Sequence, residues 1–296
     1  MFRGGRVDVV AGPALGGVIL AYEVARSLLL EVKNLCVSDL INGDKIIKDV
    51  SFYVKPNTSV AIVGESGSGK SMTVRSVMGI NKPWLYSTGS IIFEGKDLLK
   101  LSEEELRKIR GKEIYMIFQD GMSAFDPTYK IKSQMREVLG EKLGYNKEKS
   151  DESIINSMEK IFMKDAKFLI NKYPHQLSGG MLQRIMIALG LSLSPKIIIA
   201  DEPTTSLDAI TKFEVLKQFA NIKKNFGTSF LFISHDLGVV KKVADDVIVM
   251  KDGTVVEKNT ITDIFEIPEH EYTQYLINTK KKLNDKFNEV MVRKND

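Results

Sequence analysis

Apolar residues in this chain gather in short runs, with longer amphipathic stretches between them. The run from Ser59 to Gly64 is almost continuously apolar and ends in a glycine, which predicts a strand buried on both faces. Together the apolar runs predict strands at 28–37, 50–54, 59–64, 91–94, 114–118, 196–200, 229–233 and 246–250. Helical spacing predicts helices at 71–78, 103–110, 180–191 and 209–225. Strands that alternate with helices of this length indicate an α/β fold with a mainly parallel sheet.

Two parts of the chain depart from this alternation. At the start, the strands 28–37 and 50–54 are joined across the polar turn 42–44 (Asn-Gly-Asp), which predicts antiparallel strands. From about Asp120 to Pro174 the pattern is charged and helical, with no strong strand. We therefore expect a parallel-sheet core that carries an antiparallel β subdomain and an inserted α-helical subdomain at about 120–180.

Composition excludes several classes of protein. Apolar residues make up 43% of the 296 positions, so the chain can bury its own core without disulfides or metal ions. The single cysteine, Cys36, excludes an internal disulfide and any site held by several cysteines, and it fits a reducing compartment. No uncharged apolar run reaches 18 residues, so the sequence predicts no membrane-spanning helix.

A glycine-rich loop follows the strand 59–64 and fits the phosphate-binding pattern G-x-x-x-x-G-K-[ST]. Glycines permit positive φ and let backbone N–H groups approach phosphate oxygens, while the helix that follows presents its positive N-terminus. Lys70 is expected to bridge the β- and γ-phosphates of a nucleotide, and Ser71 to bind Mg²⁺. The nucleotide-binding residues predicted at this P-loop are Gly64, Glu65, Ser66, Gly67, Ser68, Gly69, Lys70, Ser71 and Met72.

A second motif places two carboxylates directly after the apolar strand 196–200. The carboxyl ends of parallel strands form the edge of the sheet at which ligands of open α/β folds bind. Asp201 is therefore predicted to hold Mg²⁺, directly or through water. Glu202 comes one residue later and is predicted to polarise the attacking water as a general base.

A P-loop and a strand that ends in carboxylates occur in kinases, GTPases, helicases and transport ATPases, so a further motif is needed to choose among them. The stretch Leu177–Arg184 (LSGGMLQR) is that motif. Its two glycines precede an apolar helix and offer a further phosphate site. With it, the chain resembles the nucleotide-binding subunits of ABC transporters. The motifs occur in that family's order, with Gln119 as the Q-loop, 177–180 as the signature, 206–208 as the D-loop and His235 as the switch histidine. The resemblance implies a P-loop NTPase fold with a RecA-like parallel sheet, and ATP and Mg²⁺ as cofactors.

In that family the signature of one subunit caps the ATP that is bound to the P-loop of the other. The resemblance therefore implies a head-to-tail dimer, with a similar but distinct ATP-binding subunit or with a second copy of this chain. It implies that Ser178, Gly179, Gly180 and Asp208 contact nucleotide. The implied catalytic residues are Glu202, His235 and Gln119, and the implied Mg²⁺ ligands are Ser71, Gln119 and Asp201.

One position departs from the family pattern. An aromatic residue usually stacks on adenine about thirty residues before the P-loop lysine, yet this chain has no aromatic residue between Tyr22 and Phe52. The equivalent position by ungapped counting is close to Ile41. We expect Ile41 or an apolar neighbour to contact the base, with weaker base recognition.

Two segments resemble the peptide/nickel subfamily of importers, namely 173–177 (YPHQL) and 268–276 (PEHEYTQYL). The segments 124–127 and 278–282 further resemble Gram-positive nickel or metal-chelate importers. Some peptide importers carry a cysteine cluster in the C-terminal extension, and its absence here favours nickel. His175 and His270 are interpreted as structural, because an ATPase subunit does not hold the cargo. Oligopeptide or dipeptide import stays open, as does a soluble ABC ATPase without a permease.

This resemblance implies two integral-membrane permease subunits, an extracytoplasmic substrate-binding protein and a place on the cytoplasmic face of the cell membrane. The predicted division is an extension at 1–28, a nucleotide-binding domain at 29–265 and a C-terminal extension at 266–296. The apolar stretch Val9–Tyr22 superficially resembles a secretory signal. Since the motifs need cytosolic ATP, we interpret residues 1–28 as an extension outside the fold or as the product of an upstream start site.

The formal net charge of +4 is confined to the two ends of the chain. Residues 1–28 carry +1, residues 277–296 carry +3, and residues 29–276 are neutral. The predicted catalytic core thus has no excess of basic residues, and we expect no nucleic-acid partner. The lysine-rich tail is interpreted as a solvated helix face rather than as a contact to the anionic inner leaflet or to a permease loop.

Overall fold

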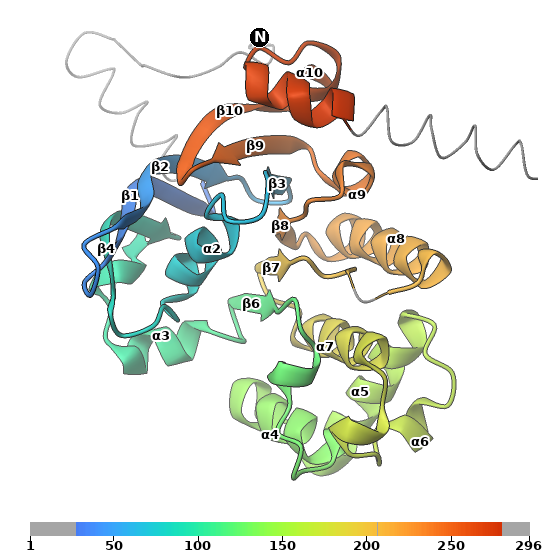
Figure 1. The fold of residues 1–296 in the computed structure, drawn as a ribbon. Coiled ribbons are helices and arrows are strands. Elements are labelled where there is room, and N and C mark those ends of the chain that lie inside the picture. The colour runs from blue at the N-terminus through green and yellow to red at the C-terminus, as the bar shows by residue number, and fades with distance from the viewer. Residues whose placement is uncertain (1–27, 206, 280–296) are drawn as a thin grey trace, which may run out of the picture.

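The computed structural model describes residues 28–205 and 207–279 (Figure 1). The predicted N-terminal extension, apart from residue 28, therefore lies outside the described residues, as do the D-loop residue Ser206 and the lysine-rich tail from residue 280 onward. Within the described residues, no helix is both long enough and apolar enough to cross a membrane.

A six-stranded sheet forms the centre, in the strand order β10-β9-β3-β8-β7-β6. Five of these strands run parallel to one another, namely β9, β3, β8, β7 and β6. Strand β10 pairs antiparallel with β9 at one edge. The strands are β3 (Ser59–Val63), β6 (Ile114–Ile117), β7 (Ile197–Asp201), β8 (Ser229–Ile233), β9 (Asp246–Lys251) and β10 (Thr254–Thr260). The predicted α/β fold with a mainly parallel sheet is confirmed.

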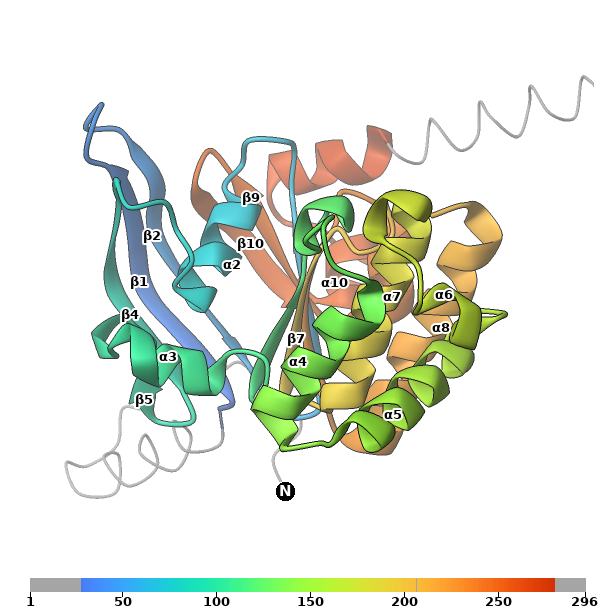
Figure 2. The same cartoon turned by 90° about the horizontal axis from the view of Figure 1, so that it is seen from below.

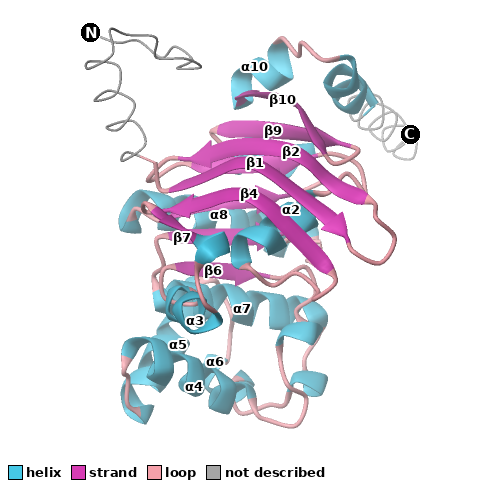
Figure 3. Cartoon of the chain, turned by 90° about the vertical axis from the view of Figure 1, so that its left-hand side faces the viewer, coloured by secondary structure: helices cyan, strands magenta, loops and turns pink. Residues whose placement is uncertain are grey.

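A four-stranded antiparallel sheet lies beside this core, in the order β2-β1-β4-β5 (Figure 3). It consists of β1 (Leu30–Asp39), β2 (Lys45–Val54), β4 (Leu85–Phe93) and β5 (Lys96–Asp97). The predicted antiparallel pair at the start of the chain is confirmed, with a polar turn between β1 and β2.

Helices cover both faces of the central sheet (Figure 2). Helix α2 (Lys70–Met78) and α3 (Glu103–Ile109) lie toward the antiparallel sheet, while α8 (Ala209–Phe226) and α9 (Leu237–Val243) lie on the opposite side. A helical group consists of α4 (Ile131–Leu143), α5 (Lys147–Lys160), α6 (Ala166–Leu169) and α7 (Gly179–Leu193). Helix α10 (Ile261–Glu266) follows β10, and residues 271–279 are also helical.

The structure extends several elements beyond the sequence pattern. Strand β2 begins at Lys45 rather than at Val50, and β4 begins at Leu85 rather than at Ile91. The added residues of β4 are mostly polar, and they enter the strand because β1 offers an antiparallel hydrogen-bonding partner along its whole length. Neither β5 nor β10 was expected, since both are short or half-exposed and lack the pattern of a buried strand.

Apolar side chains of the central sheet alternate between two cores. In β7, Ile197 and Ile199 belong to the core shared with α2 and the antiparallel sheet. Ile198 and Ala200 belong to the core shared with α7 and α8. Because both faces of the strand are packed, a shift of one residue in its register would exchange the two sets. The packing therefore fixes the height at which Asp201 leaves the sheet.

Candidate functional site

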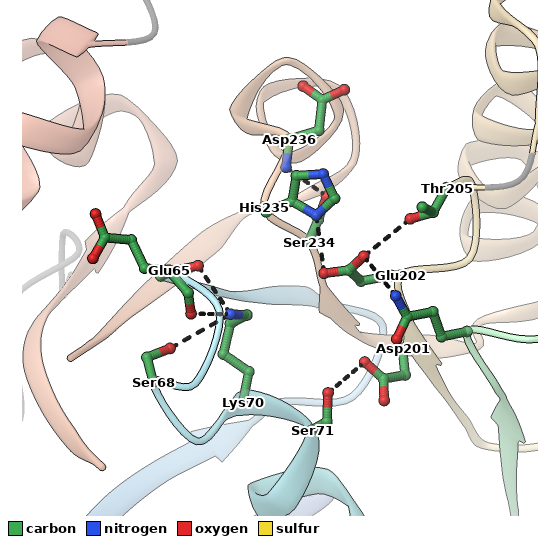
Figure 4. A network of polar contacts seen from close by, with 12 residues as sticks. Glu65, Ser68, Lys70, Ser71, Asp201, Glu202, Thr205, Ser234, His235 and Asp236 are labelled. Atoms are coloured by element: carbon green, nitrogen blue, oxygen red, sulfur yellow. Dashed lines mark hydrogen bonds and ion pairs between the residues drawn. The ribbon is translucent and has the colours of Figure 1, made fainter. Parts of the chain in front are cut away.

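The site lies at the carboxyl edge of the central sheet, where four neighbouring parallel strands end (Figure 4). Strand β3 leads into the P-loop, and β7 ends with Asp201, which is followed by Glu202. Gln119 follows β6 and His235 follows β8, each two residues beyond the strand. Since parallel strands place their carboxyl ends together, the sheet brings these side chains to one edge.

Glycines allow the P-loop to approach its neighbours closely. Gly64 has φ +152, and a Cβ there would lie 2.2 Å from the backbone oxygen of Met250. Gly69 caps helix α2 with φ +100, and a Cβ there would lie 2.5 Å from the Ile47 side chain of β2. Both positions exclude a side chain, because the left-handed backbone and the close contact each disfavour one. The backbone of the loop thus continues directly into the N-terminus of α2. Helix N-termini are common sites of anion binding.

The Lys70 ammonium group is buried within the P-loop. Its Nζ donates to the carbonyl oxygens of Gly64 at 2.9 Å and Glu65 at 2.7 Å, and to Ser68 Oγ at 3.4 Å. Burial lowers the pKa of Lys70, although the nearby carboxylates of Glu202 and Asp201 act in the opposite direction. These three acceptors are uncharged, so a phosphate group would be a stronger partner for this cation.

Asp201 and Ser71 form a pair of oxygen donors beside Lys70. Ser71 Oγ donates to Asp201 Oδ1 at 3.0 Å, and the Asp201 side chain is buried. Burial raises the pKa of Asp201, against the hydrogen bond from Ser71 and the charge of Arg75. A buried carboxylate next to a hydroxyl is the donor set that Mg²⁺ uses in nucleotide sites, where phosphates and water supply the other ligands. No cluster of three acidic, histidine or cysteine ligands occurs in the described part of the chain.

Three side chains hold the Glu202 carboxylate. Its Oε2 accepts from Gln119 Nε2 at 3.3 Å and from Thr205 Oγ1 at 3.0 Å, and its Oε1 lies 2.9 Å from His235 Nδ1 (Figure 4). The backbone of Glu202 has φ +48, a left-handed conformation that is uncommon outside glycine. Backbone strain of this kind concentrates at functional sites, where surrounding contacts enforce it. The backbone N–H of Glu202 donates to Ile233 of β8 at 2.9 Å, which ties the turn to the sheet.

The signature residues and Asp208 lie at the N-termini of two helices, where Ser178 and Asp208 act as caps. Ser178 caps helix α7, its Oγ accepting from the backbone N–H of Met181 at 3.3 Å. Ser178 and Gly179 are exposed, and nothing lies within 4 Å of a Cβ built on Gly179. Asp208 caps helix α8 by accepting from the N–H groups of Ile210 and Thr211. The predicted contacts of these residues with nucleotide stay a prediction.

Ile41, the position expected to contact adenine, lies at the turn between β1 and β2. Its side chain is 71% exposed, and its backbone N–H donates to Asp39 Oδ1 at 2.8 Å. An exposed apolar side chain of this kind is free to contact a base. The role of Ile41 stays a prediction.

The two histidines interpreted as structural have local partners. His175 stacks on Tyr173 with ring centroids 5.6 Å apart. His270 Nδ1 accepts from the backbone N–H of Tyr272 at 3.0 Å. Each ring is thus engaged by a residue two positions away, in an arrangement that fixes local structure.

Sequence reasoning missed two residues that support the site. Thr205 holds Glu202, and a polar residue three positions after a catalytic candidate gives only a weak signal. Gln183 is fully buried in α7, where its Nε2 donates to the carbonyl oxygen of Phe118 at 2.9 Å. Phe118 immediately precedes Gln119, so this bond connects the signature helix with the segment that carries Gln119.

Replacement Gln183→Met is expected to lower the free energy of unfolding by about 1–2 kcal/mol, since the Phe118 carbonyl loses its donor. The loss stays near the low end because the unpaired Oε1 of Gln183 is removed as well. Chemical denaturation would measure the change. Gln218→Met, a half-buried position on α8, serves as the matched control, and equal stabilities of the two variants would contradict the prediction.

Comparison with known proteins places these features in context. A family model described as ABC transporter matches residues 47–205. The chain is 47% identical over 263 residues to the metal-staphylopine import system ATP-binding protein CntD of Staphylococcus aureus, covering 89% of this chain and 97% of that protein. It is 44% identical over 253 residues to the oligopeptide transport ATP-binding protein OppD of Bacillus subtilis, covering 84% and 71%.

Among solved structures, the fold is similar to the ATP-binding cassette MJ0796 in its dimeric post-hydrolysis state bound to ADP and Pi. The TM-score is 0.71 at 26% identity, and the match covers 78% of this chain and 98% of that one. The cassette cbiO1 of Clostridium perfringens, part of the transporter complex cbiONQ, matches with a TM-score of 0.68 at 26% identity, covering 81% of this chain and 92% of that one.

Proposed function

The chain belongs to the ABC transporter family, and on that premise we propose that it is the ATP-hydrolysing subunit of an importer for nickel or another metal chelate. The observation that carries the ATPase assignment is the Glu202 carboxylate, held by Gln119, Thr205 and His235 at the edge of the sheet that also carries Lys70. The metal-chelate assignment is supported by the identity to CntD, which extends over 97% of that protein.

The residues of the site then divide the steps of hydrolysis among them. Lys70 leaves the P-loop carbonyls and binds the β- and γ-phosphates, while the backbone N–H groups of the P-loop and the N-terminus of α2 bind the remaining phosphate oxygens. Glu202 accepts a proton from the attacking water. Gln119 contacts the γ-phosphate and couples its presence to the conformation of the permease. His235 donates a hydrogen bond to the same phosphate.

Ser71 and Asp201 are the residues that would hold Mg²⁺, with Gln119 as a further ligand. Their oxygen atoms suit this cation, and the 3.0 Å separation between Ser71 Oγ and Asp201 Oδ1 places two donors side by side. When bound, Mg²⁺ neutralises charge on the β- and γ-phosphates.

We propose that hydrolysis takes place in a head-to-tail dimer. The exposed Ser178 and Gly179 and the half-buried Gly180 of one subunit would cap the nucleotide on the P-loop of the other, with Asp208 nearby. The partner is a similar but distinct ATP-binding subunit or a second copy of this chain. The dimer would act on two permease subunits at the cytoplasmic face of the membrane, with an extracytoplasmic binding protein delivering the cargo. Residues 29–265 would form the cassette and 266–296 its C-terminal extension.

The cargo is tested in the reconstituted transporter with its cognate binding protein. We expect nickel chelates to stimulate ATP hydrolysis and peptides to leave it at the basal rate. Free Ni²⁺ and the metal-free chelator are the matched controls for the metal chelate. The identity to OppD favours peptide import as the second candidate. Stimulation by peptides alone would replace the metal-chelate proposal with the peptide one.

A further inference from the structure

The C-terminal segment makes a hydrogen bond to the P-loop. The hydroxyl of Tyr272, from the helical residues 271–279, accepts a hydrogen bond from the backbone N–H of Glu65 at 3.0 Å. The two residues are 207 positions apart, and the Tyr272 side chain is buried. A hydroxyl is therefore directed at the P-loop from outside the elements that form the nucleotide site.

This hydrogen bond acts on a peptide group that Lys70 also contacts. Glu65 N–H and Gly64 C=O are the two ends of the same peptide group, and the Gly64 oxygen accepts from Lys70 Nζ at 2.9 Å. Tyr272 thus holds one end of the group and Lys70 the other. If Lys70 moves to the phosphates, Tyr272 remains as the contact that orients this peptide group.

Tyr272 is itself firmly placed. The carboxylate of Glu257 on β10 accepts the backbone N–H groups of Glu269 and His270, each at 3.0 Å. Burial alone would raise the pKa of Glu257, but hydrogen bonds from the segment 269–273 keep it below its usual value. Lys251 Nζ lies 5.0 Å from the centre of the Tyr272 ring. A buried carboxylate on the sheet therefore holds the start of the segment that carries Tyr272.

The same segment also borders the far side of the nucleotide site. Tyr275, Leu276 and Thr279 line a cavity of about 160 Å³ together with Glu65 and His235. Burial raises the pKa of the Tyr272 phenol, so the hydroxyl stays protonated at neutral pH. A change in the position of this segment would therefore alter the surroundings of both Glu65 and His235.

We propose that Tyr272 is a positioning residue for ATP, which keeps the Gly64–Glu65 peptide group oriented once Lys70 has moved to the phosphates. The proposal rests on the ATPase function proposed above. Without nucleotide, loss of the hydroxyl removes the acceptor of the Glu65 N–H, but Lys70 still orients the peptide group through the Gly64 oxygen. Once Lys70 binds the phosphates, the variant has neither of these two contacts, so the orientation of the group is lost as well. The cost therefore falls on binding, and the C-terminal segment sets nucleotide affinity.

The test is Tyr272→Phe in the full chain, which keeps the ring and removes the hydroxyl. We expect the Kd for ATP with Mg²⁺, measured by calorimetry, to rise roughly 3- to 10-fold, the equivalent of one neutral hydrogen bond. In the assembled transporter KM for ATP should rise by the same factor with kcat unchanged. The melting temperature without nucleotide should fall only slightly, because the Glu65 N–H loses one neutral hydrogen bond. Tyr53→Phe, at an exposed ring on β2, is the matched control.

A second variant tests the anchor. Glu257→Gln replaces one acceptor oxygen by an amide group facing backbone donors, and we expect it to raise the Kd for ATP as Tyr272→Phe does. An unchanged Kd in Tyr272→Phe overturns the inference, whether or not the protein melts earlier. If Lys70→Met also binds ATP normally, the proposed function itself fails. If Lys70→Met alone loses binding, only the role of Tyr272 is wrong.

Discussion

Replacement Glu202→Gln is expected to lower ATP turnover by roughly 10²–10⁴-fold, the range for loss of a general base, while nucleotide binding is retained. The amide has the shape of the carboxylate and can still contact Thr205, Gln119 and His235, so the edge of the sheet keeps its structure. It cannot accept a proton from water. Phosphate release would measure turnover, and calorimetry would measure binding.

Two comparisons make this result specific. Glu266→Gln changes an exposed carboxylate at the end of α10 in the same way and should leave turnover unchanged. In the Glu202→Gln variant, bound ATP should stay intact and the dimer with its partner subunit should persist. Wild-type turnover in Glu202→Gln would show that another group activates the water.

The second large effect is expected for Lys70→Ala, which should strongly weaken nucleotide binding. The buried Lys70 ammonium group donates only to uncharged acceptors of the P-loop in this structure. With a phosphate as acceptor, its hydrogen bonds would be charge-assisted on both sides and therefore stronger. Losing two such bonds, at about 1.5–3 kcal/mol each, weakens binding by roughly 10²–10⁴-fold. Ligand-induced stabilisation reports this directly, because ATP at 100 times its Kd raises stability by about 2.7 kcal/mol.

Because alanine also removes a buried aliphatic stem, Lys70→Met is the companion variant that keeps the stem and removes the charge. We expect both variants to lose the thermal shift on adding ATP. Lys258→Met, at an exposed position of β10, should keep it. An ATP-induced shift of wild-type size in Lys70→Met would contradict the role given to the ammonium group.

Several features of this protein could be predicted from the sequence because they are local. The P-loop needs glycines, a lysine and a hydroxyl at fixed spacing between a strand and a helix, and those spacings are visible along the chain. The strands β3, β7, β8 and β9 are apolar on both faces, so their runs identify them within a residue or so. Asp201 and Glu202 could be placed at the sheet edge for the same reason.

Other features depend on which strands become neighbours, and local pattern carries no information about that. Glu202 meets Gln119 across 83 positions and His235 across 33, because β7 lies between β6 and β8 in the sheet. The residues 87–90 of β4 (Ser-Thr-Gly-Ser) have no apolar pattern and become a strand only through their partner β1.

The sequence by itself therefore determined the nucleotide chemistry, since each motif is built from residues close together in the chain. Only the tertiary structure decided how these motifs support one another. The contact between Tyr272 and Glu65 spans 207 positions, and the bond between Gln183 and Phe118 spans 65. Such contacts form when packed sheets and helices fix distant segments in one place, and no periodicity along the chain encodes that placement.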